Sequence, residues 1–435
     1  MSTFPPEGYV PVASAVPGIA VFAPAPEVPE QEAPVVEFRC PQCQATTAYS
    51  VEDGGLRCAY CGHYEPPETA IVGKGAEAFE FTVETVAAAR EAHGWGTERL
   101  TLRCESCGSE TSLPPGSLTH TCPFCASNRV LHQEAPQEHL RPRFLIPFRV
   151  EPARCQAIAR EWLGSSWMTP TALKDAAKIA DFAGVYMPYW TFDARTTAHW
   201  RAEVGHQVTE RYYDSSDKTW KTRTKTVWRW ESGRAGRLFD DLLISGSTKL
   251  SGVLLRRLQN FDTHELVPYA PSYLAGFLAQ AYDVPLEPAW ETAREAMRAA
   301  TQDTCRGQAS TSQIRNFSMS LDFSDESWRH ILVPVYVAAY RYEDEPYRVM
   351  INGQTGAVAG QRPVDWTKVW LAAAAMVAPG ILLALLGVFA SALGAVLPPS
   401  FLLGGGAMLL GLLLLIIGAV FAIITLNKAR SMDDI

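Results

Sequence analysis

Two long apolar segments near the C-terminus constrain what the rest of the chain can be. They cover residues 369–397 and 401–426, and neither contains a charged side chain. About 20 apolar residues suffice for a helix to cross a bilayer core, and soluble cores rarely use uncharged runs of this length. Pro398, Pro399 and Ser400 between them can turn the chain but not continue a helix. We therefore predict two transmembrane helices; the alternative is a buried helical hairpin of a soluble protein.

Basic residues flank this pair of segments but are missing from the connector. Arg362 and Lys368 precede the first segment, and Lys428 and Arg430 follow the second. Because basic residues accumulate on the cytoplasmic side of membrane helices, both ends are predicted to be cytoplasmic. The chain also starts without the basic and apolar regions of a cleavable signal peptide. The expected location is the bacterial inner membrane, with two spans and with the N-terminal domains and the C-terminus in the cytoplasm.

Residues within and beside the apolar segments predict how the helices sit and pack. Trp366 and Trp370 stand where interfacial aromatic anchors belong. Pro379 predicts a kink in the first helix. Ala407 and Gly411, four residues apart, predict close helix contact within the hairpin or with another copy of the chain. A homo-oligomer is therefore compatible with the sequence.

The chain is acidic and long enough for two or three domains. It has 435 residues and a net charge of -8, which argues against a protein that simply coats nucleic acid. Residues 1–36 contain eight prolines and no basic residue. This composition predicts a disordered, proline-rich tail.

Eight of the ten cysteines form two identical spacing patterns. Each pattern is C-x2-C-x14-C-x2-C, and the second is displaced from the first by 64 positions. The eight residues are Cys40, Cys43, Cys58, Cys61, Cys104, Cys107, Cys122 and Cys125. A cytosolic location disfavours disulfides, and the repeat indicates an internal duplication. Cys155 and Cys305 lack such partners and are predicted to be buried small side chains.

The spacing of the eight cysteines suits zinc. A C-x-x-C turn directs two thiolates at one point, and two such turns complete the tetrahedron that zinc prefers. Four cysteines leave no open position, so we predict two structural zinc ions and no catalytic one. His63 and His120 lie close to the cysteines and are the alternative ligands. The predicted units are a first zinc ribbon at residues 37–66, a linker or packing segment at 67–98 and a second ribbon at 99–132.

Residues beside the cysteines support this interpretation. Small residues that let backbone N–H groups approach sulfur follow three of the turns, and they are Gly62, Gly108 and Ala126. Arginines that can offset the negative charge of four thiolates precede three of the turns, and they are Arg39, Arg57 and Arg103.

At its four cysteine turns, CPQC, CAYCG, CESCG and CPFCA, the chain resembles bacterial proteins with tandem zinc ribbons of the transcription-factor-B type. Such chains are often described as related to the primosomal helicase. A helicase needs a phosphate-binding loop of the form G-x-x-x-x-G-K-[ST], and this sequence contains none. Helicase activity is therefore not expected.

Residues 141–363 are predicted to form an α+β domain with a possible internal duplication. Short aromatic and β-branched runs alternate there with two amphipathic segments. A strand at 145–150 followed by a helix from Glu151 is echoed by a strand at 282–286 followed by a helix from Glu287. Two further strand starts match in the same order, at YMPYW (186–190) and LVPVY (332–336). Because these matches are short, a shared local pattern without duplication is the alternative.

One predicted hairpin of this domain has two contrasting faces. It runs over residues 192–213 and 218–231, with a turn at 214–217. Four basic residues share one face at the strand period of two: Lys221, Arg223, Lys225 and Arg229. The other face carries Trp220, Thr222, Thr224, Thr226, Trp228 and Trp230. Such a surface can contact nucleic acid or anionic lipid, or it is a solvated strand face over a Trp-rich core.

No catalytic motif is recognised, and the chain is not predicted to be an enzyme. His264-Glu265 lacks the second histidine of H-E-x-x-H, and no G-x-S-x-G is present. Asp240, Asp241 and Asp262 are predicted to cap helices or to end strands.

The whole organisation resembles a family of uncharacterised bacterial membrane-anchored proteins with tandem zinc ribbons. The resemblance covers about residues 37–430 and includes LIPFRV (145–150), GVYMPYWTFDA (184–194) and DTHELVPY (262–269). It implies flotillin-like or phage-shock-type membrane-stress proteins as partners. The predicted function is a membrane-anchored cytosolic adaptor or scaffold that recruits proteins through its ribbons. The alternative is a membrane-tethered nucleic-acid-binding protein that uses the ribbons and the basic hairpin.

Overall fold

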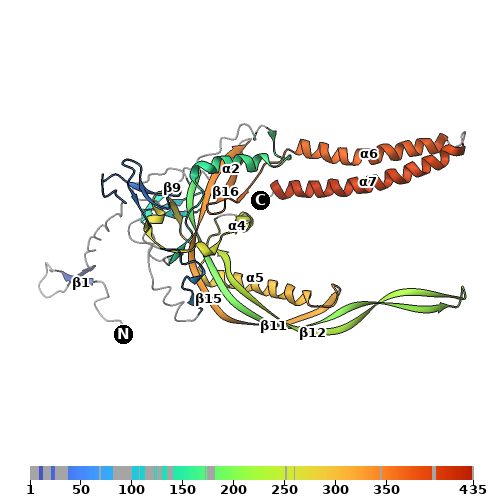
Figure 1. Ribbon diagram of the computed structural model, residues 1–435, viewed down its shortest axis with the longest axis horizontal. Helices are drawn as coiled ribbons and strands as arrows, with labels where there is room; N and C mark the ends of the chain where they lie inside the picture. Colours follow the sequence, from blue (N-terminus) through green and yellow to red (C-terminus); the bar gives the residue numbers. More distant parts are fainter. Residues whose placement is uncertain are drawn as a thin grey trace.

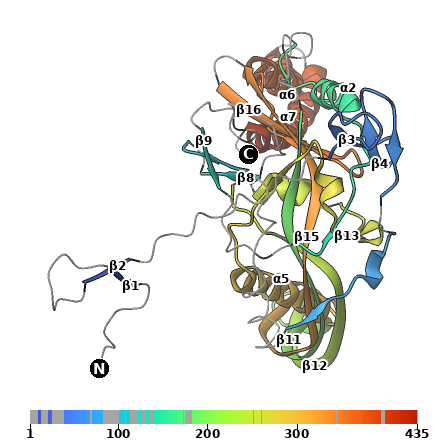
Figure 2. The ribbon, with the colours of Figure 1, turned by 90° about the vertical axis from the view of Figure 1, so that its left-hand side faces the viewer.

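The computed structural model is an elongated body with two long projections that leave it in the same direction (Figure 1). It describes residues 9–12, 21–24, 38–67, 70–81, 100–106, 108–112, 122, 124, 130–134, 140, 142–171, 173, 182–249, 252–258, 260–342, 345–393 and 398–433. One projection is a pair of helices and the other is a β arm. Figure 2, which looks along the long axis, places them at opposite ends of the body.

Three very long strands build the β arm. Strand β11 (Ala183–Asp214) lies between β12 (Thr219–Ser245) and β15 (Ile314–Tyr342), and both pairings are antiparallel. The pairing with β15 ends at Val204, whereas that with β12 continues to the turn. Residues 205–228 therefore form a two-stranded ribbon at the end of the arm. The predicted turn is found at residues 215–218, but all three strands are much longer than the sequence predicted.

Helix α5 (Leu286–Gly307) covers the supported half of the arm. Its buried residues recur every three or four positions, which places them on one helix face, and they are Leu286, Ala289, Trp290, Ala293, Met297, Thr301 and Cys305. This face packs against alternating buried residues of β11, such as Phe192 and Ala198, where small side chains let the helix lie close to the sheet. The first part of the arm is consequently a rigid two-layer structure.

The body is centred on the start of the same strands. Strand β10 (Phe144–Leu145) is parallel to β15, and β14 (Leu278–Gln280) is parallel to β11. These four strands lie side by side in the order β10-β15-β11-β14. Helix α2 (Pro152–Gly164) connects β10 to β11, and α5 connects β14 to β15. The two predicted strand-helix-strand units therefore meet at the antiparallel β11-β15 pair. The topology has the arrangement that a duplication would give, and the duplication itself stays a prediction.

Two predicted strands differ from the observed ones because of proline. The strand expected at 145–150 ends at Leu145, since Pro147 has no N–H to donate to a neighbouring strand. The strand expected at 282–286 is instead β14, which ends at Gln280. Asp283 and Val284 donate their N–H groups to the Gly246 carbonyl in a bend before Pro285.

The remaining elements of the body are short. They are α4 (Gly252–Leu258), η2 (Thr263–Glu265), β13 (Val267–Pro268), η3 (Pro271–Leu274), β16 (Glu345–Asn352) and β17 (Val358–Gly360). Strand β16 pairs with β15 and, across the turn that follows Asn352, with β17. Buried aromatic residues, including Tyr186, Phe148 and Tyr336, fill the centre of this core.

The cysteine-rich region precedes this body and packs against it. It contains β3 (Thr47–Ser50), β4 (Gly55–Cys58), β5 (Tyr64–Glu65), β7 (Leu100–Cys104), β8 (Glu110–Ser112) and β9 (Val130–Glu134). Strand β8 pairs with β14, so the region around the second cysteine pattern joins the large sheet of the body. Tyr49 of β3 contacts Tyr273, with ring centroids 5.2 Å apart.

The described part of the predicted linker is a packing segment. It contains η1 (Gly73–Gly75) and β6 (Phe79–Glu80), and β6 pairs with β15. Phe79 stacks on Trp328 at 4.8 Å between ring centroids, and Phe81 stacks on Trp290 at 4.9 Å. Residues 82–99 lie outside the described part of the chain.

Within the predicted disordered tail, two short segments form a β pair. Strand β1 (Tyr9–Val12) is antiparallel to β2 (Val21–Pro24). The other residues of the predicted disordered tail up to Val36 lie outside the described part of the chain.

The C-terminal projection consists of α6 (Trp366–Leu393) and α7 (Pro398–Asp433). Both helices are long and apolar enough to cross a membrane. Helix α6 continues through Pro379. Pro398 and Pro399, predicted to form the turn, instead start α7, where the first helical turn needs no proline N–H.

Glycines line the contact between α6 and α7. They recur every seven residues, at Gly380 and Gly387 on α6 and at Gly404, Gly411 and Gly418 on α7. A Cβ atom added to Gly411 would lie only 2.8 Å from Ala384 Cα. The predicted close contact at Gly411 is therefore found, although the spacing is seven and not four, as in helices that wind around each other.

The open end of the helix pair is fixed to the body. Lys368 Nζ donates to the Thr169 carbonyl at 3.1 Å and to Thr171 Oγ1 at 2.8 Å. Met168, Val369 and Ala429 form a small buried cluster beside these bonds. The first turn of α6 and the last turns of α7 are thereby held to the loop that follows α2.

Candidate metal centre and extended arm

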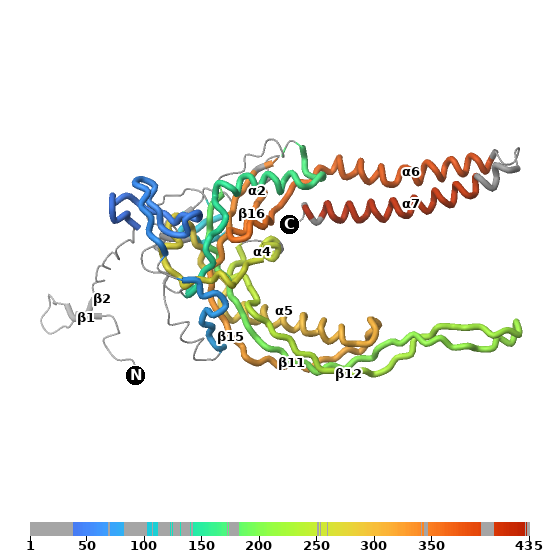
Figure 3. Tube along the Cα trace, viewed as in Figure 1, coloured from blue at the N-terminus to red at the C-terminus, as the bar shows by residue number. Residues whose placement is uncertain are grey.

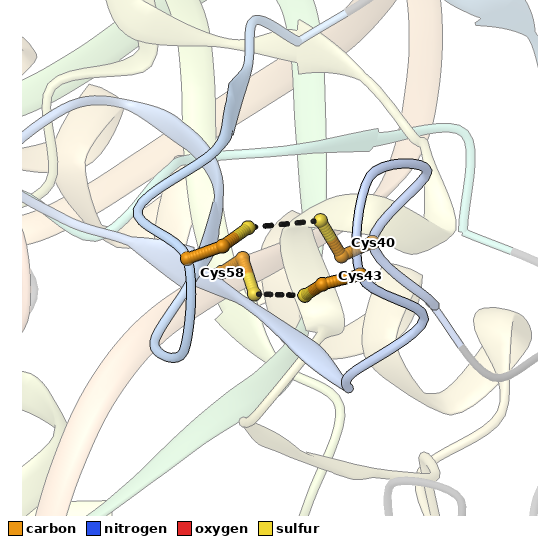
Figure 4. Close-up of side chains that lie close together, drawn as sticks. Cys40, Cys43 and Cys58 are labelled. Carbon is orange, nitrogen blue, oxygen red and sulfur yellow. Dashed lines mark hydrogen bonds between the residues drawn. The ribbon is translucent and has the colours of Figure 1, made fainter.

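The first cysteine cluster is built by turns on either side of the β3-β4 hairpin. Cys40 and Cys43 lie in the turn before β3, and Cys58 and Cys61 lie at the end of β4 and in the turn that follows. Antiparallel pairing of Thr47 with Cys58 brings the two turns together. Figure 4 shows the thiols of the two turns pointing toward one another.

The four sulfur atoms are spaced as ligands of one metal ion. Cys40 Sγ lies 3.5 Å from Cys61 Sγ, and Cys43 Sγ lies 3.5 Å from Cys58 Sγ. All four sulfurs lie within 4.8 Å of one another, and all four are free thiols. A metal–sulfur bond of about 2.3 Å in a tetrahedron places sulfurs about 3.8 Å apart. The cluster could therefore hold a metal ion without rearrangement of the backbone.

Three of the four cysteine turns have the same backbone geometry. The first cysteine of each turn accepts from the N–H four residues on and donates to the carbonyl five residues on, at 2.8–3.0 Å. The residue four positions on has a positive φ in each case: Gln44 (60°), Gly62 (76°) and Gly108 (66°). The predicted glycines Gly62 and Gly108 thus occupy a left-handed backbone position. Gln44 occupies the same position in the turn that starts at Cys40.

The second cysteine cluster is described in part. Cys104 and Cys122 are buried, and Ser109 Oγ lies 3.3 Å from Cys122 Sγ. The turn at Cys104 repeats that of the first cluster, with Gly108 N–H donating to the Cys104 carbonyl. Cys107 and Cys125 lie outside the described residues, as do Ala126 and His120. The binding of a metal by this set of four therefore stays a prediction.

Backbone N–H groups favour the thiolate at Cys58. Those of Cys61 and Tyr60 lower the pKa of the Cys58 thiol to about 6. His63 contributes its backbone carbonyl to Cys58 N–H, and the candidate metal-binding group at this site consists of cysteines alone. Two of the three arginines beside the cysteines also pair with carboxylates: Arg57 lies 2.6 Å from Asp53, and Arg103 lies 3.9 Å from Glu110.

Cys155 and Cys305 are buried small side chains, as predicted. Both are fully buried. Burial raises the pKa of the Cys155 thiol to about 12, so this thiol is neutral at physiological pH. Neither cysteine belongs to a cluster that could hold a metal among the described residues.

The predicted basic face of the hairpin is present on β12, but acidic residues neutralise most of it. Lys221 Nζ lies 2.7 Å from Asp214 and 2.5 Å from Asp217. Glu210 pairs with Lys225 at 2.7 Å and with Arg223 at 3.5 Å. These three basic residues therefore face three carboxylates in the same ribbon. Arg229, the fourth predicted residue, is exposed and is paired with Val204, the last residue of β11 that also pairs with β15.

The opposite face of the arm carries tryptophans with arginines stacked on them. Arg315 lies 4.1 Å above the Trp228 ring, and Arg201 lies 4.2 Å above the Trp230 ring. The positive charge of an arginine is attracted to the face of an aromatic ring, and this attraction holds the two groups together. The sequence predicted the aromatic face but not these arginines, because Arg201 and Arg315 belong to other strands.

Of the three aspartates predicted to cap helices or to end strands, only Asp262 does so, because Asp240 and Asp241 lie within β12. Asp262 accepts the N–H of His264 at 2.9 Å and so caps η2. Asp241 forms a buried ion pair with Arg329, and Asp240 pairs with Lys74. Lys74 and Arg329 thus offset two of the three negative charges of Asp193, Asp240 and Asp241.

One serine, histidine and glutamate meet at the end of α5. Ser310 Oγ lies 2.5 Å from Glu231 Oε1 and 3.5 Å from His206 Nε2, and Glu231 Oε1 lies 3.0 Å from the same nitrogen. A serine–histidine–carboxylate triad uses both ring nitrogens of the histidine. Here Ser310 and Glu231 both contact the same nitrogen, Nε2 of His206. These three side chains therefore connect the turn after α5 to the arm and do not form a catalytic triad.

These features define a β-rich protein with a candidate metal centre in its cysteine-rich region and two apolar helices at its C-terminus. No protein-family model matches the chain, and no solved structure matches it. The chain is similar to the uncharacterized protein YdjG of Bacillus subtilis (strain 168), with 25% identity over 339 residues. The match covers 77% of this chain and 92% of that protein. The similarity therefore extends over most of both chains.

Proposed function

We propose that the protein is a membrane-anchored adaptor whose cysteine-rich region binds protein partners at the cytoplasmic face of the inner membrane. The observation that carries the proposal is the pairing of an all-cysteine cluster with a pair of apolar helices fixed to the same body. The cluster supports a rigid docking module, and the helices support an anchor.

Zinc is the metal that we propose for the cluster. Four thiolates in tetrahedral array suit zinc, and the S–S separations of 3.5 Å in the first cluster fit that array. A four-cysteine site leaves no position for substrate or water, so its role is structural. Such an ion supplies folding energy to a module with little core of its own. The same assignment for the second cluster rests on its identical spacing and on the shared turn at Cys104.

The attachment of the anchor supports a scaffold role. Lys368 and the buried cluster of Met168, Val369 and Ala429 hold the helix pair against the body. The first cysteine module packs on the opposite side of the same core through Tyr49 and Tyr273. A partner bound to the module would consequently be held at a defined distance from the bilayer. Flotillin-like and phage-shock-type membrane proteins are the partners that we propose.

The test is crosslinked purification of the full-length protein from native membranes in mild detergent, with a Cys58→Ser/Cys122→Ser variant alongside. Copurification of membrane-stress or flotillin-like proteins with the wild type, and their loss in the variant, is the expected result. A Cys155→Ser variant is the matched control, because that thiol is buried outside both clusters. Recovery of nuclease-sensitive nucleic acid in place of protein would favour the nucleic-acid-binding alternative and would contradict the adaptor.

A further inference from the structure

The β arm points toward the membrane that the apolar helices would enter. Helices α6 and α7 and the ribbon of β11 and β12 leave the body toward the same side, as Figure 3 also shows. Ten residue pairs, from Gly205 with Trp228 to Asp214 with Thr219, make the ribbon about 33 Å long. Insertion of the helices along this direction would bring the ribbon to the same bilayer.

The ribbon cannot enter the hydrocarbon core. It has eight charged side chains between residues 205 and 228. Its two strands also leave backbone N–H and C=O groups unpaired along both outer edges, and lipid tails cannot satisfy them. The ribbon must therefore stop at the lipid headgroups. Pairing with β15 stops at Val204, and the contacts made by residues 310–315 reach only Gly205, His206 and Trp228 of the ribbon. The part of the ribbon beyond these residues can therefore bend along the surface.

The tip of the ribbon has the composition of a membrane-interface contact. Tyr213 and Trp220 face each other across the two strands, with ring centroids 5.5 Å apart. Their exposed fractions are 50% and 64%, although both are large aromatic residues. Arg211 lies on the same face, 5.9 Å above the Trp220 ring. Tryptophan and tyrosine are enriched at the membrane–water interface, where an apolar ring body and a polar edge are both satisfied.

The charge that remains free in the ribbon lies beside these aromatic residues. The ribbon carries five basic and three acidic residues, a net charge of +2 in a chain of net charge -8. The acidic residues pair with Lys221, Arg223 and Lys225. Arg211 and the turn residue Lys218 form no ion pair with another described side chain. The unpaired positive charge is thus at the tip, next to Trp220, and complements an anionic lipid surface.

We propose that the tip of the β11-β12 ribbon, formed by Tyr213, Trp220, Arg211 and Lys218, binds the anionic headgroup layer of the membrane that α6 and α7 cross. This inference rests on the proposed membrane anchor. It gives the body two attachments, one at the helix pair and one at the end of the arm, and so fixes how the docking modules are oriented over the membrane.

The test uses the full-length chain in liposomes of phosphatidylglycerol and phosphatidylethanolamine. The photoreactive residue p-benzoylphenylalanine replaces Trp220, Leu413 or Tyr60 in separate preparations, and lipid adducts are measured by mass spectrometry after illumination. Leu413 is an exposed residue of α7 and reports the anchor, and Tyr60 is 85% exposed on the cysteine-rich region and is the negative control. Lipid adducts at Trp220 and Leu413 but not at Tyr60 are expected.

Two further preparations test the charge. Replacement of Arg211 and Lys218 by glutamine is expected to lower the lipid adducts at position 220 roughly tenfold, since each basic residue contributes to binding at an anionic surface. Phosphatidylcholine liposomes should give a similar loss. Adducts at Leu413 without any at Trp220, or Trp220 adducts to protein or nucleic acid in place of lipid, would overturn the proposal and leave the anchor intact. Absence of adducts at Leu413 would remove the anchor and the proposal together.

Discussion

Arg329 forms a buried ion pair with Asp241, and the two side chains are 7% and 5% exposed. Arg329 also lies 3.3 Å from Asp193 and donates its Nε–H to the Ala76 carbonyl at 3.0 Å. One guanidinium therefore joins β15, β11, β12 and the segment that precedes β6. The pairing connects the cysteine-rich region to the core of the body.

Replacing Arg329 by methionine is expected to destabilise the protein by about 3–5 kcal/mol, because it leaves a buried carboxylate without its partner. Urea unfolding of the purified protein in detergent, followed by tryptophan fluorescence, measures the change. Arg195→Met is the matched control, since Arg195 pairs with Asp325 at 3.3 Å on the exposed surface, where an ion pair contributes less than about 1 kcal/mol. Equal losses for the two variants would contradict the buried role of Arg329.

The destabilisation by Arg329→Met should also depend on pH. Burial raises the pKa of Asp241 above the usual value, and removal of Arg329 raises it further. The folded state then binds this proton more tightly than the unfolded chain, so stability falls as the pH rises above about 4. The variant should be closest to the wild type near pH 4. A difference that shrinks between pH 4 and 7 would show that Asp241 is not the group involved.

Elemental analysis of the undamaged protein is expected to return two zinc ions per chain, one for each set of four cysteines. Cys58→Ser removes one ligand of the first cluster and should leave one ion bound. Cys155→Ser should keep both ions, since this cysteine is buried in the core of the body. One ion or none in the wild type would contradict the prediction of two sites.

The sequence predicted what local spacing determines. The four-cysteine spacing predicted that Cys40, Cys43, Cys58 and Cys61 lie together, and they do. The uncharged runs predicted two long apolar helices, which are α6 and α7. It did not predict features that depend on which strands are neighbours. The basic face of β12 is largely neutralised by Glu210, which lies opposite Arg223 across the ribbon. Only the register of the two strands reveals this pairing, because the residues are 13 positions apart and the turn could have been shifted by one residue.

The sequence pattern also did not predict how long the strands are. Charged residues interrupt the apolar alternation along β11 and β15, so local propensity ended the predicted strands too early. In the structure, α5 covers one face of these strands, and small side chains such as Ala198 and Ala202 are buried under it. Tertiary packing therefore extends strands that their own residues only weakly favour.

Asp214, at the turn of the ribbon, should stay ionised down to very low pH. Lys221 Nζ and the Ser216 hydroxyl hold the pKa of Asp214 at about 2. Because this pKa lies below the usual value of about 3.9, the pair stabilises the ribbon above about pH 4, and the contribution is lost as the pH falls toward 2. Carbon-13 NMR of labelled aspartate gives the pKa directly. Lys221→Met should raise it toward 3.9, and an unchanged value would show that Lys221 does not contact Asp214 in solution.

Close contact between α6 and α7 should depend on the glycines at their interface. A Cβ atom at Gly411 would meet the backbone of Ala384, whereas one at Gly406 would meet nothing within 4 Å. Gly411→Leu is therefore expected to separate the helices and to lower the free energy of unfolding by about 1–3 kcal/mol, the range for an overpacked site. Gly406→Leu, which adds the same side chain to the same helix, should leave it unchanged. Thermal unfolding in detergent compares the two variants, and equal stability would show that α6 and α7 are not packed through Gly411.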